Sequence, residues 1–258
     1  MYDGFSQDYD RFVNWSQRLE YELPFLEGFC QSLIPPEGAA AKILDAACGT
    51  GMHAIALAER GYACAGADLS TAMVQRARQN AAMRGVSVRF ETAGMGEMWK
   101  VFGEGSFEAA LCLGNSLPHL LTAEALRDAL VDFSRLLKRK GGLVIQNRNF
   151  EAVLSQQQRA MEPQSWKDDT GEWLFLRFYD FLDNGLIQFN VITLKRSEGG
   201  AWTQSWQSAM LKPYRKAELE SALIEAGFTN LQFFGGLGGE PFQAKSSGNL
   251  VIVARKGD

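Results

Sequence analysis

The stretch that decides the fold runs from Lys42 to Gly51 and reads Lys-Ile-Leu-Asp-Ala-Ala-Cys-Gly-Thr-Gly. Its apolar start predicts a short buried strand that ends in an acidic residue, Asp45, and its small residues predict a tight loop. The residues that follow, from Met52 to Ala58, are typical of a helix. A strand, a glycine turn and a helix N-terminus form a cradle for a nucleotide-like ligand, because glycines let a ligand approach the backbone closely.

The glycines alone do not decide which ligand the cradle holds. The run from Gly49 to Ala54 also fits the dinucleotide-binding pattern G-x-G-x-x-G/A, and a turn without any ligand is a third interpretation. Asp45 discriminates among them, because a carboxylate four positions before the first glycine would repel a pyrophosphate. The same carboxylate suits a cation, and the sequence therefore favours a positively charged ligand.

A second acidic residue supports this interpretation. The segment from Tyr62 to Ser70 predicts another buried strand that ends at Asp68. Asp68 lies close to the spacing of about 20 residues after the glycine loop at which an acidic residue binds ribose hydroxyls. Asp68 or Ser70 is also suited to cap the helix expected from Thr71. If Ser70 is the cap, Asp68 can bind the ribose.

Together these segments resemble the class I S-adenosylmethionine-dependent methyltransferases. The resemblance implies a Rossmann-like α/β fold in which the acidic residue and the glycines hold the methionine part of S-adenosyl-L-methionine. Relatives often carry an acidic residue after the third strand for the adenine amino group, whereas this chain has Gly94-Met95, whose backbone we expect to serve instead. The cofactor-binding residues implied by the resemblance are Asp45, Ala47, Gly49, Gly51, Asp68, Leu69, Gly94, Met95, Leu113 and Arg18.

Two later runs resemble glycine N-methyltransferase and its bacterial glycine/sarcosine relatives. One is Cys112 to Leu120, and the other is Arg148-Asn149-Phe150, each after a predicted strand where ligands bind open α/β sheets. The resemblance, which covers roughly residues 40–155 well, implies that Arg148 holds the carboxylate of an amine acceptor and that Asn115 contacts the same acceptor. A surface salt bridge for Arg148 and a turn position for Asn115 are the structural alternatives.

The N-terminal region completes the site implied by the resemblance. Tyr9 and Arg18 lie in a segment similar to the one that covers the cofactor in relatives, so Tyr9 would close the methyl-transfer pocket and Arg18 would pair with the cofactor carboxylate. Aromatic residues in such a stripe are also common in cores. His119 is the nearest histidine to the acceptor site, but a structural histidine is the simpler interpretation, so no general base is assigned.

The pattern along the chain predicts three parts. Residues 1–40 form an N-terminal helical cap, with a helix from Asn14 to about Leu33 and a connector at Pro35 to Gly38. Residues 41–150 and 213–258 form the S-adenosylmethionine-binding domain, a seven-stranded, mostly parallel sheet with helices on both faces. Residues 151–212 form a small antiparallel β lid inserted after the fifth strand, with a second turn at Ser197 to Gly200. The expected strands are 42–46, 62–67, 86–92, 106–113, 141–147, 228–234 and 249–255, and the expected helices are 51–60, 71–84, 122–138 and 214–226.

Composition excludes several classes of protein. The chain has 258 residues, 22% of them charged, and a net charge of −4, which argues against a nucleic-acid partner. The basic run Lys138-Arg139-Lys140 is expected at a helix C-terminus, where it complements the dipole. Four cysteines and two histidines match no metal or disulfide pattern, and reduced thiols favour the cytoplasm. No apolar run reaches the ~18 residues of a membrane span.

We therefore expect a methyltransferase that acts on the nitrogen of a small, carboxylate-bearing amine similar to glycine or sarcosine. Methyl transfer to oxygen or carbon of an aromatic small molecule is the alternative, because the inserted region is rich in aromatic residues. An S-adenosylmethionine-binding module without turnover and a nicotinamide-dependent oxidoreductase are the competitors from other classes. The sequence leaves the oligomeric state open.

Overall fold

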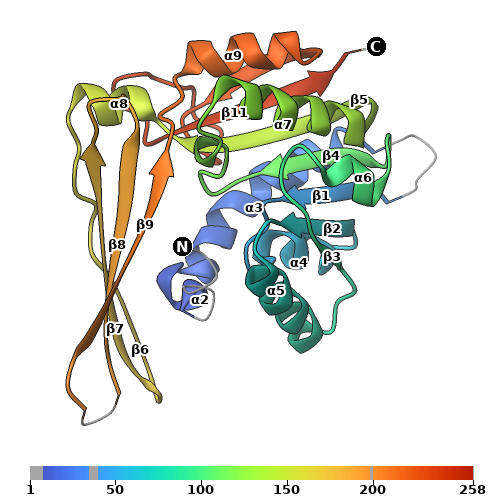
Figure 1. The fold of residues 1–258 in the computed structure, drawn as a ribbon. Helices are drawn as coiled ribbons and strands as arrows, with labels where there is room; N and C mark the ends of the chain where they lie inside the picture. Colours follow the sequence, from blue (N-terminus) through green and yellow to red (C-terminus); the bar gives the residue numbers. More distant parts are fainter. Residues whose placement is uncertain (1–7, 35–39, 198–199, 258) are drawn as a thin grey trace.

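The computed structural model describes residues 8–34, 40–197 and 200–257 (Figure 1). The expected connector at Pro35–Gly38 lies outside these residues, and so do Glu198 and Gly199 of the expected second turn in the insertion. Within the described part of the chain, no helix is both long enough and apolar enough to cross a membrane.

The main sheet has seven strands in the order β10-β11-β5-β4-β1-β2-β3. Strands β3, β2, β1, β4 and β5 run parallel to one another, whereas β11 runs antiparallel to both β5 and β10. The predicted seven-stranded, mostly parallel sheet is confirmed. Its strands are β1 Lys42–Ala46, β2 Ala63–Asp68, β3 Arg89–Thr92, β4 Phe107–Cys112, β5 Leu137–Arg148, β10 Phe228–Phe234 and β11 Asn249–Lys256.

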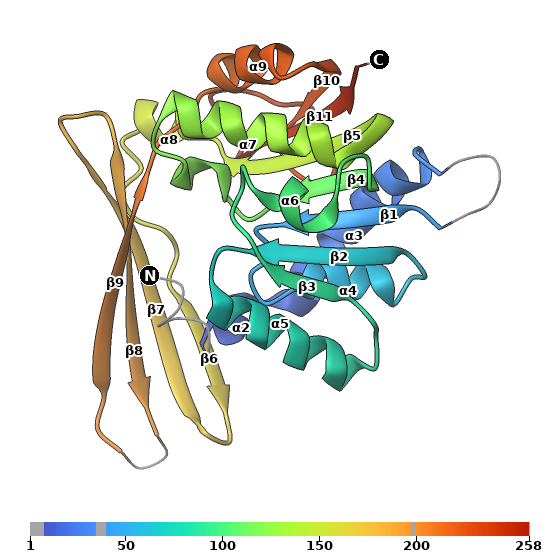
Figure 2. The same cartoon turned by 45° about the vertical axis from the view of Figure 1, so that its right-hand side comes forward.

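Helices cover both faces of this sheet, which explains why its strands are continuous apolar runs rather than alternating ones (Figures 1 and 2). On one face, α3 and α4 pack over a core that contains Ile43 and Val144. On the other, α7 and α9 pack over Leu44 and Ile145. The helices of the domain are α3 Trp15–Gln31, α4 Met52–Ala58, α5 Thr71–Arg84, α6 Met98–Phe102, α7 Ala123–Leu136 and α9 Lys216–Glu225.

Capping residues fix where these helices begin. The side chain of Asn14 accepts a hydrogen bond from the Gln17 amide at the start of α3, and Ser70 accepts one from the Met73 amide at the start of α5. Gly85 then ends α5 in the left-handed conformation that glycine adopts most easily. Ser70 is therefore the cap of the predicted helix 71–84, which leaves Asp68 available for another role.

A second sheet is inserted between β5 and α9 and extends away from the main sheet (Figure 1). It has four antiparallel strands, β6 Gln164–Asp168, β7 Gly171–Phe181, β8 Ile187–Arg196 and β9 Thr203–Leu211. The predicted antiparallel insertion is confirmed, but β6 was not expected. A short helix, α8 Phe150–Ser155, precedes this sheet, and its N-cap is the side chain of Asn149.

The basic run Lys138-Arg139-Lys140 does not end a helix, so that prediction is wrong. Helix α7 ends at Leu136, and the run belongs to the start of β5, where Leu137 pairs with Phe107 of β4. The Lys138 ammonium forms an ion pair with Glu108 of β4. Strand pairing and this ion pair therefore overrode the helical pattern of residues 122–138.

Candidate functional site

A cavity of about 500 Å³ opens at the carboxyl ends of β1, β2 and β4. This edge is the usual ligand-binding edge of an open α/β sheet. Nearly all of the predicted cofactor residues line it, although they come from five separate segments of the chain. They are Arg18, Asp45, Ala47, Gly49, Asp68, Leu69, Gly94, Met95 and Leu113.

Asp45 is the most unusual group in this cavity. Its side chain is 2% exposed, and its Oδ2 has no hydrogen-bond partner among the described residues. Burial raises the pKa of Asp45 to about 6, although the nearby His53 acts in the opposite direction. A buried carboxylate oxygen without a partner is unfavourable unless a cation or donor meets it. This arrangement fits the α-ammonium of S-adenosylmethionine.

Gly51 is the one predicted cofactor residue that does not line the cavity. It is the N-cap of α4 and has a φ of 78°. A Cβ built on Gly51 would lie 2.6 Å from a ring carbon of Phe90 and 2.9 Å from the Cβ of Ala77. Gly51 is therefore needed for the turn and for the close approach of α4 to its neighbours, whereas Ala47 and Gly49, with φ values of 56° and 55°, shape the cavity wall.

The carboxylate of Asp68 holds the loop in place and still faces the cavity. Its Oδ2 accepts a hydrogen bond of 2.9 Å from the Gly49 amide, and its Oδ1 accepts one of 2.9 Å from the Ser70 amide. Next to Asp68, Leu69 is 79% exposed and lies 3.3 Å from where a Cβ of Gly94 would be. Leu69, Gly94 and Met95 thus form one continuous part of the cavity wall.

The start of α3 contributes a buried charged network to the same cavity. Arg18 Nε donates to Glu22 at 3.0 Å, and Glu22 Oε2 lies 2.6 Å from His53 Nε2. Burial would raise the pKa of Glu22, but its contacts with His53 and Arg18 outweigh that effect and lower it. The guanidinium of Arg18 also lies over the ring of Trp15, at 5.2 Å from the ring centroid. Arg18 is therefore held rigidly at the cavity wall.

A second cavity of about 610 Å³ brings Tyr9, Asn115 and Arg148 together, as the sequence predicted for the acceptor site. It adjoins the first cavity, because Tyr9, Arg18, Gly114 and His119 line both. Its far wall comes from the inserted sheet. Tyr179 of that wall belongs to the aromatic residues for which the inserted region was expected to suit a flat acceptor. Arg177, which shares one face of β7 with Tyr179, was not predicted from the sequence.

Asn115 occupies a turn and contacts the neighbouring strand at the same time. Gly114 and Asn115 have φ values of 73° and 65°, and the Gly114 amide donates to Gln146 Oε1 at 2.7 Å. The side-chain oxygen of Asn115 accepts a 2.9 Å hydrogen bond from the backbone amide of Arg148. The turn interpretation is therefore correct, and the side-chain amide group of Asn115 is the part that remains for contact with a ligand.

The guanidinium of Arg148 has no carboxylate partner within ion-pair distance in the described ranges. Its Nη2 donates to Gln158 Oε1 at 3.0 Å, and its Nε is buried without a hydrogen-bond partner. The surface salt bridge that was the alternative for Arg148 is thus not what the structure contains. A guanidinium that is partly buried and incompletely satisfied is suited to bind an anion.

Three titratable side chains around the second cavity are held in their neutral forms. Burial lowers the pKa of His119 to about 4, and burial raises the pKa of Tyr179 to about 12 against the charges of Arg148 and Arg177. Burial also raises the pKa of Tyr9. At the junction between the cavities, the imidazole of His119 and the phenol of Tyr9 are therefore neutral at physiological pH.

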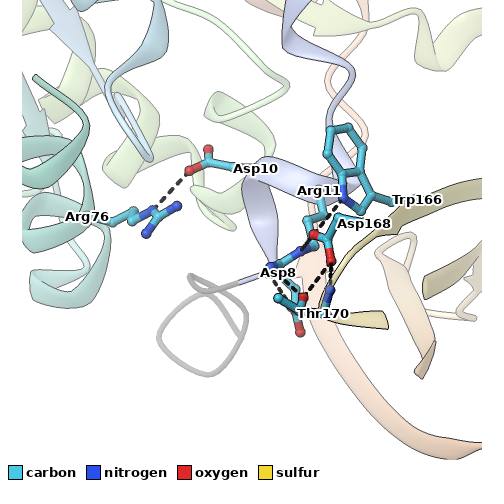
Figure 3. Close-up of polar contacts among 7 residues, drawn as sticks. All are labelled: Asp8, Asp10, Arg11, Arg76, Trp166, Asp168 and Thr170. Atoms are coloured by element: carbon cyan, nitrogen blue, oxygen red, sulfur yellow. Dashed lines mark hydrogen bonds and ion pairs between the residues drawn. The ribbon is translucent and has the colours of Figure 1, made fainter. Parts of the chain in front are cut away.

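A short helix, α2 Tyr9–Phe12, connects the inserted sheet to the main domain (Figure 3). Asp10 points toward α5, where it accepts hydrogen bonds from Arg76 and Asn80, both at 3.1 Å. Arg11 points toward the inserted sheet and contacts Asp168 of β6 at 3.0 Å. The helix therefore spans the opening between the two sheets and holds Tyr9 at the junction of the two cavities.

Comparisons with known proteins agree with this geometry. The profile of the family described as "Methyltransferase domain" matches residues 43–141. The glycine/sarcosine N-methyltransferase of Aphanothece halophytica is 30% identical over 233 residues, which cover 90% of this chain and 81% of the relative.

Solved structures share the fold at lower sequence identity. A S-adenosylmethionine-dependent methyltransferase from Clostridium acetobutylicum superposes with a TM-score of 0.79 at 17% identity, covering 100% of this chain and 99% of the other. An amino pentose methyltransferase from Micromonospora echinaspora, solved with S-adenosylmethionine bound, has a TM-score of 0.67 at 20% identity, with 92% of this chain and 91% of the other covered.

Sequence identity over most of both chains and a cavity that fits the cofactor lead to the same conclusion. The chain belongs to the S-adenosylmethionine-dependent methyltransferases, in the family that contains the bacterial glycine/sarcosine N-methyltransferases.

Proposed function

We propose that the enzyme methylates the nitrogen of a small amine that carries a carboxylate. The observation that carries the proposal is Arg148, a guanidinium without a carboxylate partner among the described residues, which lines a cavity contiguous with the cofactor cavity. Relatives at about 30% identity are named glycine/sarcosine N-methyltransferases, and glycine and sarcosine are amines of this class.

The cofactor residues have separate tasks in this proposal. Asp45 meets the α-ammonium of S-adenosylmethionine, and Arg18 pairs with the carboxylate of the same end. Asp68 accepts hydrogen bonds from the ribose hydroxyls. Leu69, Gly94 and Met95 flank the adenine, and the backbone of Ala47, Gly49 and Leu113 completes the wall. The bound cofactor supplies a methyl group on a positively charged sulfur.

The acceptor residues provide alignment. Arg148 holds the acceptor carboxylate through two parallel hydrogen bonds, which fixes the direction of the amine. The amide group of Asn115 contacts the same acceptor, and Tyr9 closes the passage between the cavities and excludes water.

The amine must reach the reaction in its neutral form. Enclosure in a dry cavity beside cationic Arg148 disfavours an ammonium, since both desolvation and like charge lower the pKa of an amine. His119 is neutral at physiological pH but is a weak proton acceptor with a pKa of about 4. We therefore assign deprotonation to the environment of the acceptor and not to one side chain.

The test is Arg148→Ala, with Arg127→Ala on the exposed surface of α7 as the matched control. We expect Arg148→Ala to abolish turnover of carboxylated amines while binding of S-adenosylhomocysteine, measured by calorimetry, persists. Arg127→Ala should resemble the parent enzyme in both measurements. An unchanged KM for a carboxylated amine in Arg148→Ala would overturn the proposal.

A second candidate is methyl transfer to oxygen or carbon of a flat aromatic acceptor. It is favoured by the apolar part of the second cavity, where Phe12, Met161 and Phe189 lie. A panel of amines and phenols, scored by the release of S-adenosylhomocysteine, separates the two candidates. Binding of the cofactor without turnover of any panel member would favour a binding module instead.

A further inference from the structure

A second cationic side chain, Arg177, lines the acceptor cavity from the opposite sheet. It lies on β7, and its Nε is buried without a hydrogen-bond partner. Its Nη2 donates to the backbone carbonyl of Glu162 at 3.3 Å, and its guanidinium lies 5.1 Å from the centroid of the Phe12 ring. Within the described ranges no carboxylate is in ion-pair distance of Arg177, so its charge is as incompletely compensated as that of Arg148.

The charges around the cavity are unbalanced. Among the described residues that line it, Glu22 is the one acidic side chain, and it is already engaged by Arg18 and His53. Arg148 and Arg177 are close enough that, after burial, the charge of Arg148 contributes to lowering the pKa of Arg177. Two like charges around a partly enclosed cavity repel each other more strongly than in water, and bound anions would remove that repulsion.

The cavity is also large for the smallest acceptors. Its volume of about 610 Å³ is in the range of sites that enclose drug-sized ligands, far more than glycine or sarcosine fills. Arg148 stands at the end of β5 in the main sheet, whereas Arg177 stands on the inserted sheet. The two guanidinium groups therefore approach the cavity from different walls, which suits two anionic groups on one ligand.

We infer that the acceptor is an amine with two carboxylates, one bound by Arg148 and the other by Arg177. The inference rests on the proposed function, in which Arg148 binds the first carboxylate. It adds Arg177 as the residue that selects acidic acceptors over neutral ones of the same size. An Arg–carboxylate pair of this kind contributes enough free energy to change affinity by about tenfold or more.

The first test is binding of probes that contain no amine, so it does not depend on catalysis. Calorimetry on enzyme saturated with S-adenosylhomocysteine would compare succinate with propionate and glutarate with butyrate. We expect each dicarboxylate to bind about tenfold more tightly than its monocarboxylate in the parent enzyme. Arg177→Gln should remove most of that difference, and Arg127→Gln should leave it unchanged. Thermal melting of each variant verifies that it folds.

The second test is turnover of pairs of amino acids with the same shape, aspartate with asparagine and glutamate with glutamine. We expect a higher kcat/KM for the acidic member than for the neutral member of at least one pair. In Arg177→Gln, the ratio of these two kcat/KM values should be near one. Equal binding of mono- and dicarboxylates by the parent enzyme would overturn the inference. An equal loss of affinity for mono- and dicarboxylates in Arg177→Gln would also overturn it, because that result would mean that the two arginines bind one shared carboxylate. A preference for dicarboxylates without methylation of any amine would instead refute the proposed function and leave Arg177 as an anion-binding residue.

Discussion

Asp45 destabilises the free protein, because the cost of burying its charge exceeds what His53, Arg18 and the Ala54 amide return, and its Oδ2 has no hydrogen-bond partner among the described residues. Its pKa rises from 3.8 to about 6 on folding, so the folded state binds a proton more readily than the unfolded state. The fold therefore loses stability as the pH rises from about 4 to above 6, and the loss is on the order of 3 kcal/mol at about 1.36 kcal/mol per pKa unit.

We predict that Asp45→Asn melts at a higher temperature than the parent enzyme at pH 8 in the absence of cofactor, and that the gain shrinks at pH 5. The variant should bind S-adenosylhomocysteine far more weakly. Asp132→Asn is the contrasting variant: burial also raises the pKa of Asp132, but its two oxygens together accept hydrogen bonds from three backbone amides, and the NH₂ group of asparagine would face some of these donors. That variant should melt at a lower temperature. Scanning fluorimetry with and without ligand measures both, and a lower melting temperature for free Asp45→Asn at pH 8 contradicts the argument.

The same carboxylate gives cofactor binding a pH dependence. Asp45 must be ionised to meet an ammonium, so affinity for S-adenosylhomocysteine should be constant above pH 7 and about tenfold weaker at pH 5. Calorimetry across this range gives the profile. Asp45→Asn should show weak binding at every pH, and a flat profile in the parent enzyme would exclude the assigned role.

Single residues were predictable from the sequence wherever a short motif places them. Asp45, Asp68 and Arg148 each follow a recognisable strand, and the ends of adjacent parallel strands meet at one edge. Arg177 was not predictable in this way. Its position depends on how the inserted sheet packs against the main one, and no local pattern in β7 encodes that contact.

At the scale of elements, the strands of the main sheet were predictable because burial on both faces makes them continuous apolar runs. Helix α2 and strand β6 were not, since they have only 4 and 5 residues and carry no clear period. The run from Lys138 to Lys140 was misassigned because the amphipathic pattern of α7 continues into it, whereas pairing with β4 is a long-range effect.

Helix α2 should be essential although it is short. Asp10 accepts hydrogen bonds from Thr50 in the glycine loop, from Trp15, and from Arg76 and Asn80 on α5. We predict that Asp10→Ala lowers the free energy of unfolding by about 1–3 kcal/mol, because it leaves several donors without a partner. The variant should also weaken binding of S-adenosylhomocysteine, since Thr50 and Trp15 are held by the same carboxylate.

Denaturant melts and calorimetry measure the two effects. Asp168→Ala removes the other end of the connection, the partly exposed ion pair with Arg11, which includes no residue of the glycine loop, and should have a smaller effect on cofactor binding. If Asp168→Ala weakens binding of S-adenosylhomocysteine as much as Asp10→Ala does, α2 does not support cofactor binding through the contacts of Asp10 with Thr50 and Trp15.

At the scale of the whole molecule, the acceptor cavity exists only where the two sheets meet. The Phe12 ring of α2 packs edge-on against Phe175 of β7, with ring centroids 5.4 Å apart, beside the fully buried Trp173. Phe12 also lies beneath the guanidinium of Arg177. The proposed cofactor cavity lies at the edge of the main sheet and the inserted sheet supplies the far wall of the second cavity, so this aromatic contact should determine acceptor binding more than cofactor binding.

We therefore predict that Phe12→Ala loosens the inserted sheet while the main sheet stays intact. Truncation of a partly buried aromatic residue should destabilise the docking by about 1–3 kcal/mol, since both packing and an edge-on ring pair are lost. Hydrogen exchange should accelerate in β7 and β8 and stay unchanged in β1 and β4. The KM of the acceptor should rise several-fold more than the dissociation constant of S-adenosylhomocysteine.

Phe178→Ala is the matched control, because Phe178 lies on the same strand but packs against Trp206 instead of α2. Equal acceleration of exchange in both sheets, or an equal rise in the acceptor KM in Phe178→Ala, would show that the contact at Phe12 does not hold the two sheets together.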